Sequence, residues 1–152
     1  MGYILGIDQG GTKTAAAVMD EAGKILGIAT RRGAYYPTDG MASAFTKIKE
    51  AVEEAIAQAG ITREQIGTAI AGITGIDWKG DEEKVTEELK KILEISDLHA
   101  YNDAVIALYC VEEGEGDMVL CAGTGMNAAV RNGEESYFVF GDYIEESMQG
   151  EA

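Results

Sequence analysis

Three glycine-containing segments, each directly after a predicted strand, constrain the fold of this chain more than any other feature. They span residues 8–14, 72–77 and 122–127. The chain has 20 glycines among 152 residues but a single proline, whereas glycine averages ~7% in proteins. We therefore interpret the glycines as positioned rather than as a linker. Backbone N–H groups in such loops can approach a phosphate because no Cβ blocks the way. A tight turn explains each loop equally well when it is taken alone.

The hydrophobic pattern predicts one α/β domain. Three strands come first, at 3–8, 13–19 and 24–30, and a turn at 20–23 favours a hairpin between the second and third. Helices and strands then alternate. The helices are expected at 41–59, from about 81 and at 102–111, and the later strands at 68–73, 98–101, 118–122, 127–131 and 137–140. This order predicts a mixed sheet with helices on its faces.

The segment 41–59 has the clearest helical pattern. Its apolar residues recur at steps of three and four, which gives one apolar stripe toward a core. Thr38 or Asp39 is expected to cap its start, and Gly60 is expected to end it.

Charge and cysteine content narrow the class of protein. The formal net charge is −15, from 27 acidic and 12 basic side chains, which argues against nucleic acid or an anionic membrane surface as a partner. No apolar run approaches the ~18 residues of a spanning helix, and no signal peptide is recognisable at the start. These features predict a cytoplasmic protein.

The cysteines and the single histidine suggest no site. Cys110 and Cys121 match neither a disulfide framework nor a metal-binding spacing. Cys110 is expected to face the core from its helix, Cys121 to be buried in a strand, and His99 to lie at a strand edge. We therefore expect no iron–sulfur cluster.

Two common nucleotide-binding motifs are absent. A P-loop has a lysine immediately after its last glycine and then a helix, whereas here Gly11 precedes Thr12 and the chain continues as a hairpin. The G-x-G-x-x-G fingerprint of dinucleotide-binding proteins is also missing after the first strand. Neither a P-loop NTPase nor a Rossmann protein fits this sequence.

Three segments in order, 6–14, 102–108 and 122–127, carry a family resemblance. Together they resemble the first domain of the actin, sugar kinase and heat-shock chaperone ATPase superfamily. The branch that they resemble most is formed by the N-acetylglucosamine kinases and the BadF/BadG/BcrA/BcrD-type ATPases. The resemblance covers essentially the whole chain. It implies a ribonuclease H-like mixed sheet, an actin-like ATPase lobe, and ATP and Mg²⁺ as cofactors.

The resemblance also implies roles for individual residues. Asp8 would hold Mg²⁺, and Asp103 would be the general base that accepts a proton from the attacking group. Gly75 and Asn127 would lie near the acceptor, which is a small molecule or water. The phosphates would be bound by two loops: Gly10, Gly11, Thr12, Lys13 and Thr14 in the first, and Gly123, Thr124 and Gly125 in the second. The plain structural alternatives are a helix N-cap for Asp103 and a strand-end turn for Asp8.

Two features depart from the family pattern. Residues 33–38 carry aromatic side chains where the sugar kinases present an asparagine to the hexose. The chain also ends about where a second lobe with the adenosine pocket would begin. We therefore expect residues 1–152 to form one N-terminal lobe without its adenosine-binding partner. Alone, that lobe would bind ATP weakly, and its uncovered surface allows a homodimer.

The function expected on this basis is the phosphate-binding and catalytic lobe of an ATP-dependent phosphotransferase, sugar kinase-like, or of an ATPase. The alternative is a non-catalytic nucleotide-sensing or dimerisation domain that kept the fold.

Overall fold

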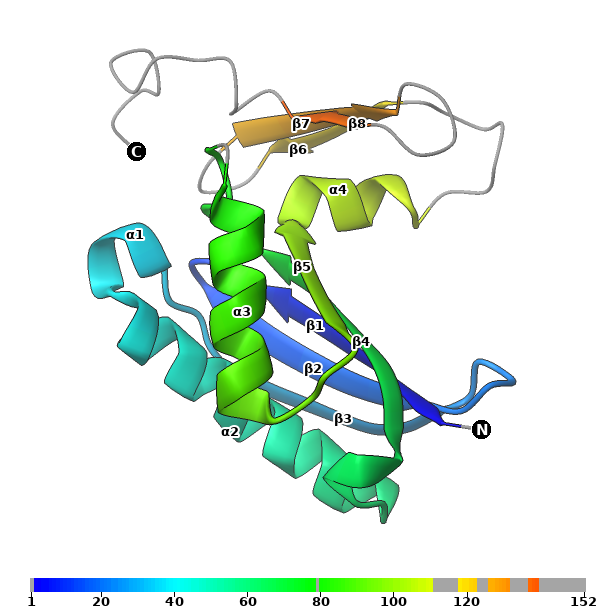
Figure 1. The fold of residues 1–152 in the computed structure, drawn as a ribbon. Coiled ribbons are helices and arrows are strands. Elements are labelled where there is room, and N and C mark those ends of the chain that lie inside the picture. The colour runs from blue at the N-terminus through cyan, green and yellow to red at the C-terminus, as the bar shows by residue number, and fades with distance from the viewer. Residues whose placement is uncertain (1, 79, 111–117, 123–125, 132–136, 140–152) are drawn as a thin grey trace.

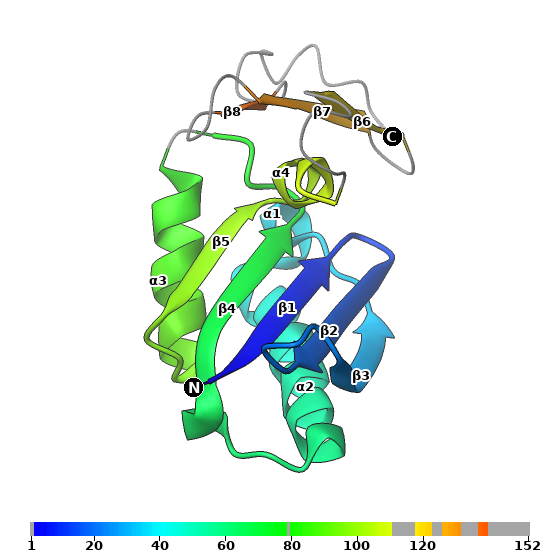
Figure 2. The same ribbon diagram turned by 90° about the vertical axis from the view of Figure 1, so that its right-hand side faces the viewer.

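A five-stranded mixed sheet forms the centre of the structure, a computed structural model that describes residues 2–78, 80–110, 118–122, 126–131 and 137–139. The sheet has the order β3-β2-β1-β4-β5, and a separate three-stranded sheet has the order β6-β7-β8 (Figures 1 and 2). The elements are β1 (Tyr3–Gln9), β2 (Lys13–Met19), β3 (Ile25–Arg32), α1 (Tyr36–Asp39), α2 (Met41–Ala59), the 3₁₀ turn η1 (Arg63–Gln65), β4 (Ile66–Ile73), α3 (Asp81–Leu93), β5 (Leu98–Asn102), α4 (Asp103–Leu108), β6 (Met118–Ala122), β7 (Met126–Arg131) and β8 (Tyr137–Val139).

The sheet topology confirms the predicted α/β order. β1, β2 and β3 pair antiparallel as a meander, whereas β4 runs parallel to β1 and β5 runs parallel to β4. Each parallel step needs a crossover, and α2 and α3 supply them. Because β1, β4 and β5 point the same way, their carboxyl ends meet at one edge of the sheet, where α4 begins (Figure 2).

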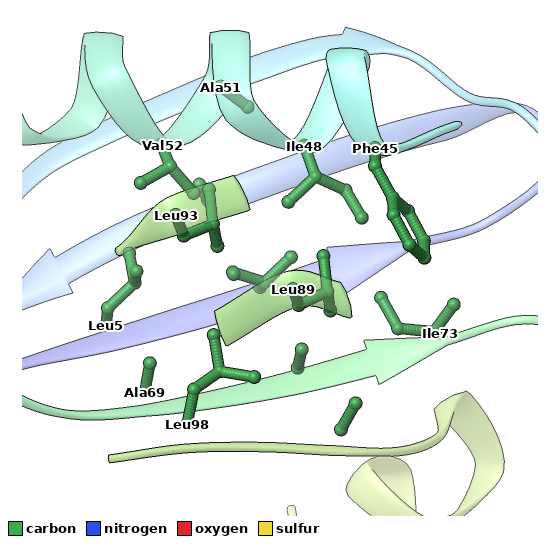
Figure 3. Close-up of a cluster of buried hydrophobic side chains, with 14 of the residues drawn as sticks. Leu5, Phe45, Ile48, Ala51, Val52, Ala69, Ile73, Leu89, Leu93 and Leu98 are labelled. Atoms are coloured by element: carbon green, nitrogen blue, oxygen red, sulfur yellow. The ribbon is translucent and has the colours of Figure 1, made fainter. Parts of the chain in front are cut away.

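The main core lies between the sheet and the two crossover helices (Figure 3). The predicted stripe of α2 is confirmed, since Phe45, Ile48 and Val52 are buried there. Alternate strand residues such as Leu5 and Ile73 meet them from the sheet. α3 adds Val85, Leu89 and Leu93. Burial of this continuous apolar surface is the main stabilising contribution in such a domain.

The ends of α2 agree only in part with the sequence. Gly60 ends the helix in the left-handed region, as predicted. The expected cap by Thr38 or Asp39 is wrong: Gly40 is the N-cap residue, and no side chain caps the helix. Asp39 instead accepts a hydrogen bond from the Tyr35 N–H at 2.8 Å, because the chain forms the short helix α1 before α2.

A second, smaller core lies on the other side of α4. Ala104, Val105 and Leu108 of α4 pack against Ala129 of β7 and Val139 of β8. α4 also contacts the first sheet, where Ile106 lies against Gly72 of β4. α4 thus lies between the two sheets (Figures 1 and 2).

The cysteine predictions need correction, and the histidine prediction holds. Helix α4 ends at Leu108 instead of 111, which leaves Cys110 exposed rather than core-facing. Cys121 is half-buried in β6 rather than fully buried. His99 lies on β5, the edge strand, as predicted.

Among the described helices, none combines the length and the apolar content that a membrane span requires.

Candidate active site

Asp8 and Asp103 lie next to each other on one face of the sheet. Asp8 is exposed near the end of β1 and is the register partner of Gly72 in β4, so both residues point to the same face. A Cβ built on Gly72 would lie 3.4 Å from the Asp103 Cα. The backbone at the start of α4 therefore approaches the sheet directly beside Asp8, and the Ile106 side chain occupies the space that a Gly72 Cβ would fill.

The environment of Asp103 makes it a stronger base than an ordinary aspartate. Burial raises the pKa of this carboxyl, and the nearby negative charge of Asp8 raises it further, against the opposite effect of hydrogen bonds from the Ala104 N–H and from Thr74. The Ala104 N–H donates to Asp103 Oδ1 at 3.0 Å. A base with a raised pKa accepts a proton more readily near neutral pH.

The raised pKa of Asp103 predicts that the stability difference between the wild type and Asp103→Asn depends on pH. The pKa of this carboxyl is 3.8 in the unfolded chain and higher in the folded chain. Its contribution to the stability of the fold is therefore lost as the pH rises through the folded value. We expect Asp103→Asn to raise the Tm at pH 7 by on the order of 2 °C, and this gain to shrink toward pH 3. Thermal unfolding followed by circular dichroism across this pH range measures it.

Glu64→Gln is the matched control with the opposite sign. A hydrogen bond with Thr62 lowers the pKa of Glu64, so its ionised form stabilises the fold above pH 4.5, and that contribution is lost as the pH falls. Glu64→Gln should therefore lower the Tm at pH 7. A Tm of Asp103→Asn that stays below that of the wild type from pH 3 to 8 would contradict the assignment of Asp103.

The first glycine loop joins β1 to β2 in a tight turn. The Gly10 N–H donates to the Lys13 carbonyl at 2.8 Å, and the Gly33 N–H donates to the Thr12 carbonyl at 2.9 Å. Gly11, Thr12 and Lys13 are exposed. A Cβ on Gly33 would lie 2.2 Å from the Gly10 carbonyl oxygen. Gly33, which the sequence analysis did not single out, therefore packs its backbone directly against the backbone of the loop.

Thr14, the last residue of the predicted loop, points its side chain to the other face of the sheet. It is fully buried and pairs with the equally buried Gln9, so both side chains point to the α2 face, opposite to Asp8. Gln9 holds the chain there by a hydrogen bond from its amide to the Ala34 carbonyl. The Thr14 hydroxyl is thus not placed on the Asp8 side of the sheet.

Two basic residues lie opposite each other beside the loop. Lys13 and Arg32 are exposed register partners on β2 and β3. Lys13 lies two residues before Ala15, the partner of Asp8, so Lys13, Arg32 and Asp8 share one face. Directly opposed like charges repel each other, and a bound anion relieves that repulsion. Arg32 is a functional candidate that the sequence analysis missed.

The amide side chains of Asn102 and Asn127 meet beside Asp103. Asn102 caps α4 by accepting a hydrogen bond from the Ala104 N–H at 2.9 Å. Its oxygen also lies 3.3 Å from the Asn127 amide nitrogen. Asn127, expected from the sequence to lie near the acceptor, is thus brought from β7 to the carboxyl end of β5.

Gly75 lies in the turn after β4, in contact with the aromatic stretch. Its φ is +91°, and a Cβ there would meet the Tyr35 ring at 2.8 Å and Pro37 at 2.9 Å. The Tyr36 hydroxyl donates to the Gly75 carbonyl at 2.6 Å. Burial, with the charges of Asp81 and Asp77, raises the pKa of Tyr36, which keeps this hydroxyl protonated and able to donate.

β7 also holds the far end of α4. Arg131, the last residue of β7, donates to the Leu108 carbonyl at 3.2 Å, and its guanidinium lies 5.0 Å from the centre of the Tyr109 ring. A cation near a helix C-terminus is favourable. Asn127 and Arg131 of one strand therefore contact the two ends of the same short helix.

The described residues thus bring together most of the predicted site. Asp8, Asp103, Asn127 and the loop from Gly10 to Lys13 lie at the edge of the sheet where β1, β4 and β5 end. Gly123, Thr124 and Gly125 lie outside the described residues. No group of three or more histidine, cysteine or acidic side chains gathers to hold a metal in the described part of the chain.

The sequence profile of the BadF/BadG/BcrA/BcrD ATPase family matches residues 5–144. The chain belongs to this family. The resemblance inferred from the residues is confirmed, and this BadF/BadG-type ATPase chain has the actin-like, ribonuclease H-like fold that the family implies. A comparison with curated proteins gives no match.

Solved structures with the same fold include sugar kinases. A protein assigned as an N-acetylglucosamine kinase from Chromobacterium violaceum is 20% identical, with a TM-score of 0.68, over 91% of this BadF/BadG-type chain and 48% of its own. A ROK family glucokinase from Streptomyces griseus, solved with glucose and AMPPNP, is 24% identical, with a TM-score of 0.63. The match covers 85% of this chain and 44% of the glucokinase. The chain thus spans about half the length of these structures.

A structure outside the sugar kinases also shares the fold. Component A of the (R)-2-hydroxyglutaryl-CoA dehydratase of Acidaminococcus fermentans is 16% identical, with a TM-score of 0.51, over 91% of the BadF/BadG-type chain and 47% of its own. The chain therefore belongs to an ATPase family, and its fold is the one that these sugar kinases and component A share.

Proposed function

We propose that this chain is the phosphate-binding and catalytic part of an ATP-dependent phosphotransferase that acts on a small hydroxyl-bearing acceptor, or of an ATPase with water as the acceptor. The observation that carries the proposal is the position of Asp103. This carboxyl of raised pKa lies beside Asp8 at the carboxyl edge of the sheet, where ligands of open α/β sheets bind. The glucokinase solved with glucose and AMPPNP has the same fold, which supports the proposal.

Asp103 acts as the general base in this proposal. Phosphoryl transfer depends mainly on positioning and electrostatic stabilisation, and a carboxylate that accepts the proton of the attacking hydroxyl is one recurring component. In this proposal the N–H groups of the exposed loop residues Gly11 and Thr12 bind phosphate oxygens. Lys13 and Arg32 add positive charge on the same face.

The donor set of Asp8 fits Mg²⁺. Asp8 is exposed and presents hard oxygen ligands beside a second carboxylate, and Mg²⁺ is commonly held by one or two carboxylates together with phosphate oxygens and water. When bound, Mg²⁺ neutralises phosphate charge. Asp8 would hold the ion beside Asp103, with phosphate oxygens and water as further ligands.

Isothermal titration of the protein with ATP, with and without Mg²⁺, tests the binding part of the proposal. Turnover with a panel of sugars, followed by ³¹P NMR, tests the catalytic part. We expect Mg²⁺-dependent binding in the micromolar to millimolar range and release of ADP. Asp8→Asn should weaken Mg²⁺-ATP binding by about tenfold or more, whereas Asp97→Asn, an equal change of charge outside the site, should not. Nucleotide binding without turnover under any acceptor would favour a nucleotide-sensing domain. The proposal falls if Mg²⁺-ATP is not bound.

A further inference from the structure

We propose that Asp77 is a positioning residue, which orients the amides of Asn102 and Asn127 and, through Asn102, places Asp103 for catalysis. Its catalytic consequence rests on the proposed function. The structural part of the inference does not, because it follows from hydrogen bonds between described residues.

Asp77 receives both amide groups on a single oxygen. Its Oδ1 lies 2.9 Å from the Asn102 amide nitrogen and 3.4 Å from the Asn127 amide nitrogen. An ionised carboxylate accepts hydrogen bonds and cannot donate them. Both asparagines must therefore turn their NH₂ groups, rather than their oxygens, toward Asp77.

The orientation of Asn102 decides how α4 begins. Asn102 is 1% exposed, and its NH₂ group also donates to the Ile76 carbonyl at 2.8 Å. With the NH₂ group fixed there, its oxygen faces the start of α4. A flipped amide would bring its oxygen against two acceptors and leave buried polar groups unpaired, which is unfavourable.

The oxygens of Asn102 and Asp103 share one donor. The Ala104 N–H lies 2.9 Å from Asn102 Oδ1 and 3.0 Å from Asp103 Oδ1. A rotation of the Asn102 amide changes this shared contact and with it the direction of the Asp103 carboxylate. Asp77 thus acts on Asp103 indirectly, through Asn102 and the Ala104 N–H.

Asp77 also connects segments that are distant in sequence. It lies in the turn after β4, Asn102 ends β5, and Asn127 lies on β7 of the other sheet. The two contacts of the Asn127 NH₂ group, at 3.3 and 3.4 Å, are long and shared, as in three-centre hydrogen bonds. Asp77 therefore links the two sheets at the edge where Asp103 lies.

Asp77→Asn tests the inference because it keeps the shape of the side chain and replaces an acceptor-only group by one that also donates. In this variant, amide hydrogen exchange of Ala104 should become at least about tenfold faster. Its kcat should fall by about 10–100-fold, the effect of a small misplacement of a reacting group, with the KM for ATP within about threefold. Glu83→Gln, an exposed residue with an equal change of charge, is the control.

Asp77→Glu is the second variant, since it restores an acceptor-only carboxylate. We expect it to recover part of the kcat that Asp77→Asn loses, and slower exchange at Ala104. Unchanged exchange at Ala104 in Asp77→Asn would overturn the orienting role. Faster exchange with a kcat within twofold of the wild type would overturn the catalytic placement. If the wild type itself does not bind Mg²⁺-ATP, the proposed function fails, and exchange at Ala104 still decides whether Asp77 orients the amides.

Discussion

Asp103→Asn is expected to lower kcat by about 10²–10⁴-fold, the usual contribution of a general base. Asparagine keeps the size of the side chain and an oxygen that can accept from the Ala104 N–H, so the start of α4 is preserved. It cannot accept a proton from the attacking hydroxyl. The KM for ATP should change by less than about threefold, because Asp103 acts on the acceptor side of the transferred group. Steady-state kinetics with a coupled ADP assay measures both constants.

Combined with the stability prediction, this variant separates catalysis from folding. Asp103→Asn should be at least as stable as the wild type at pH 7 while it is nearly inactive, because the raised pKa of Asp103 means that its ionised form costs stability. A stability cost at a catalytic position is common in enzymes. A variant with a kcat within threefold of the wild type would leave Asp103 as a helix N-terminal residue and remove it from the mechanism.

Gly33→Ala is the second change with a large expected effect. The added Cβ would lie 2.2 Å from the Gly10 carbonyl oxygen and 2.5 Å from the Lys13 nitrogen. These are backbone atoms, so the loop or β3 must move. Overpacking of this kind costs about 1–3 kcal/mol. Because the displaced atoms belong to the proposed phosphate loop, Mg²⁺-ATP affinity should fall by more than about tenfold, as measured by isothermal titration.

Gly6→Ala is the matched control for Gly33→Ala. Gly6 lies on β1, and a Cβ there would meet no atom within 4 Å. Its nucleotide affinity should stay within about twofold of the wild type, since alanine is compatible with an extended strand. Equal affinities of Gly33→Ala and Gly6→Ala for Mg²⁺-ATP would show that the loop between β1 and β2 does not bind the phosphates.

The sequence predicts those elements that depend on local patterns. The meander could be predicted because apolar runs flank the turn at 20–23, where the Asp20 carboxylate accepts from the N–H groups of Ala22 and Lys24. The helix α2 could be predicted because its apolar stripe repeats over 19 residues. The proximity of Asp8 and Asp103 follows from the parallel pairing of β1 with β4 and of β4 with β5, an arrangement that the alternation of strands and helices indicates.

The features that could not be predicted depend on contacts between distant residues. Helix α1 has four residues and is held by the bond from Tyr36 to Gly75, which are 39 positions apart. The role of Asp77 depends on Asn102 and Asn127, which lie 25 and 50 positions away. For Arg32, the signal was its register with Lys13, which requires the strand pairing to be known. A single sequence does not show which of its distant residues are in contact.

The contacts of β7 with both ends of α4 have a consequence for motion. Asn127 lies near the first turn of the helix, and Arg131 binds its last carbonyl. A rotation of the three-stranded sheet against the five-stranded sheet would therefore tilt α4 with it and swing the Asp103 carboxylate. The angle between the two sheets and the direction of the Asp103 carboxylate would then change together, so a ligand that fixed this angle would also fix the position of the proposed base.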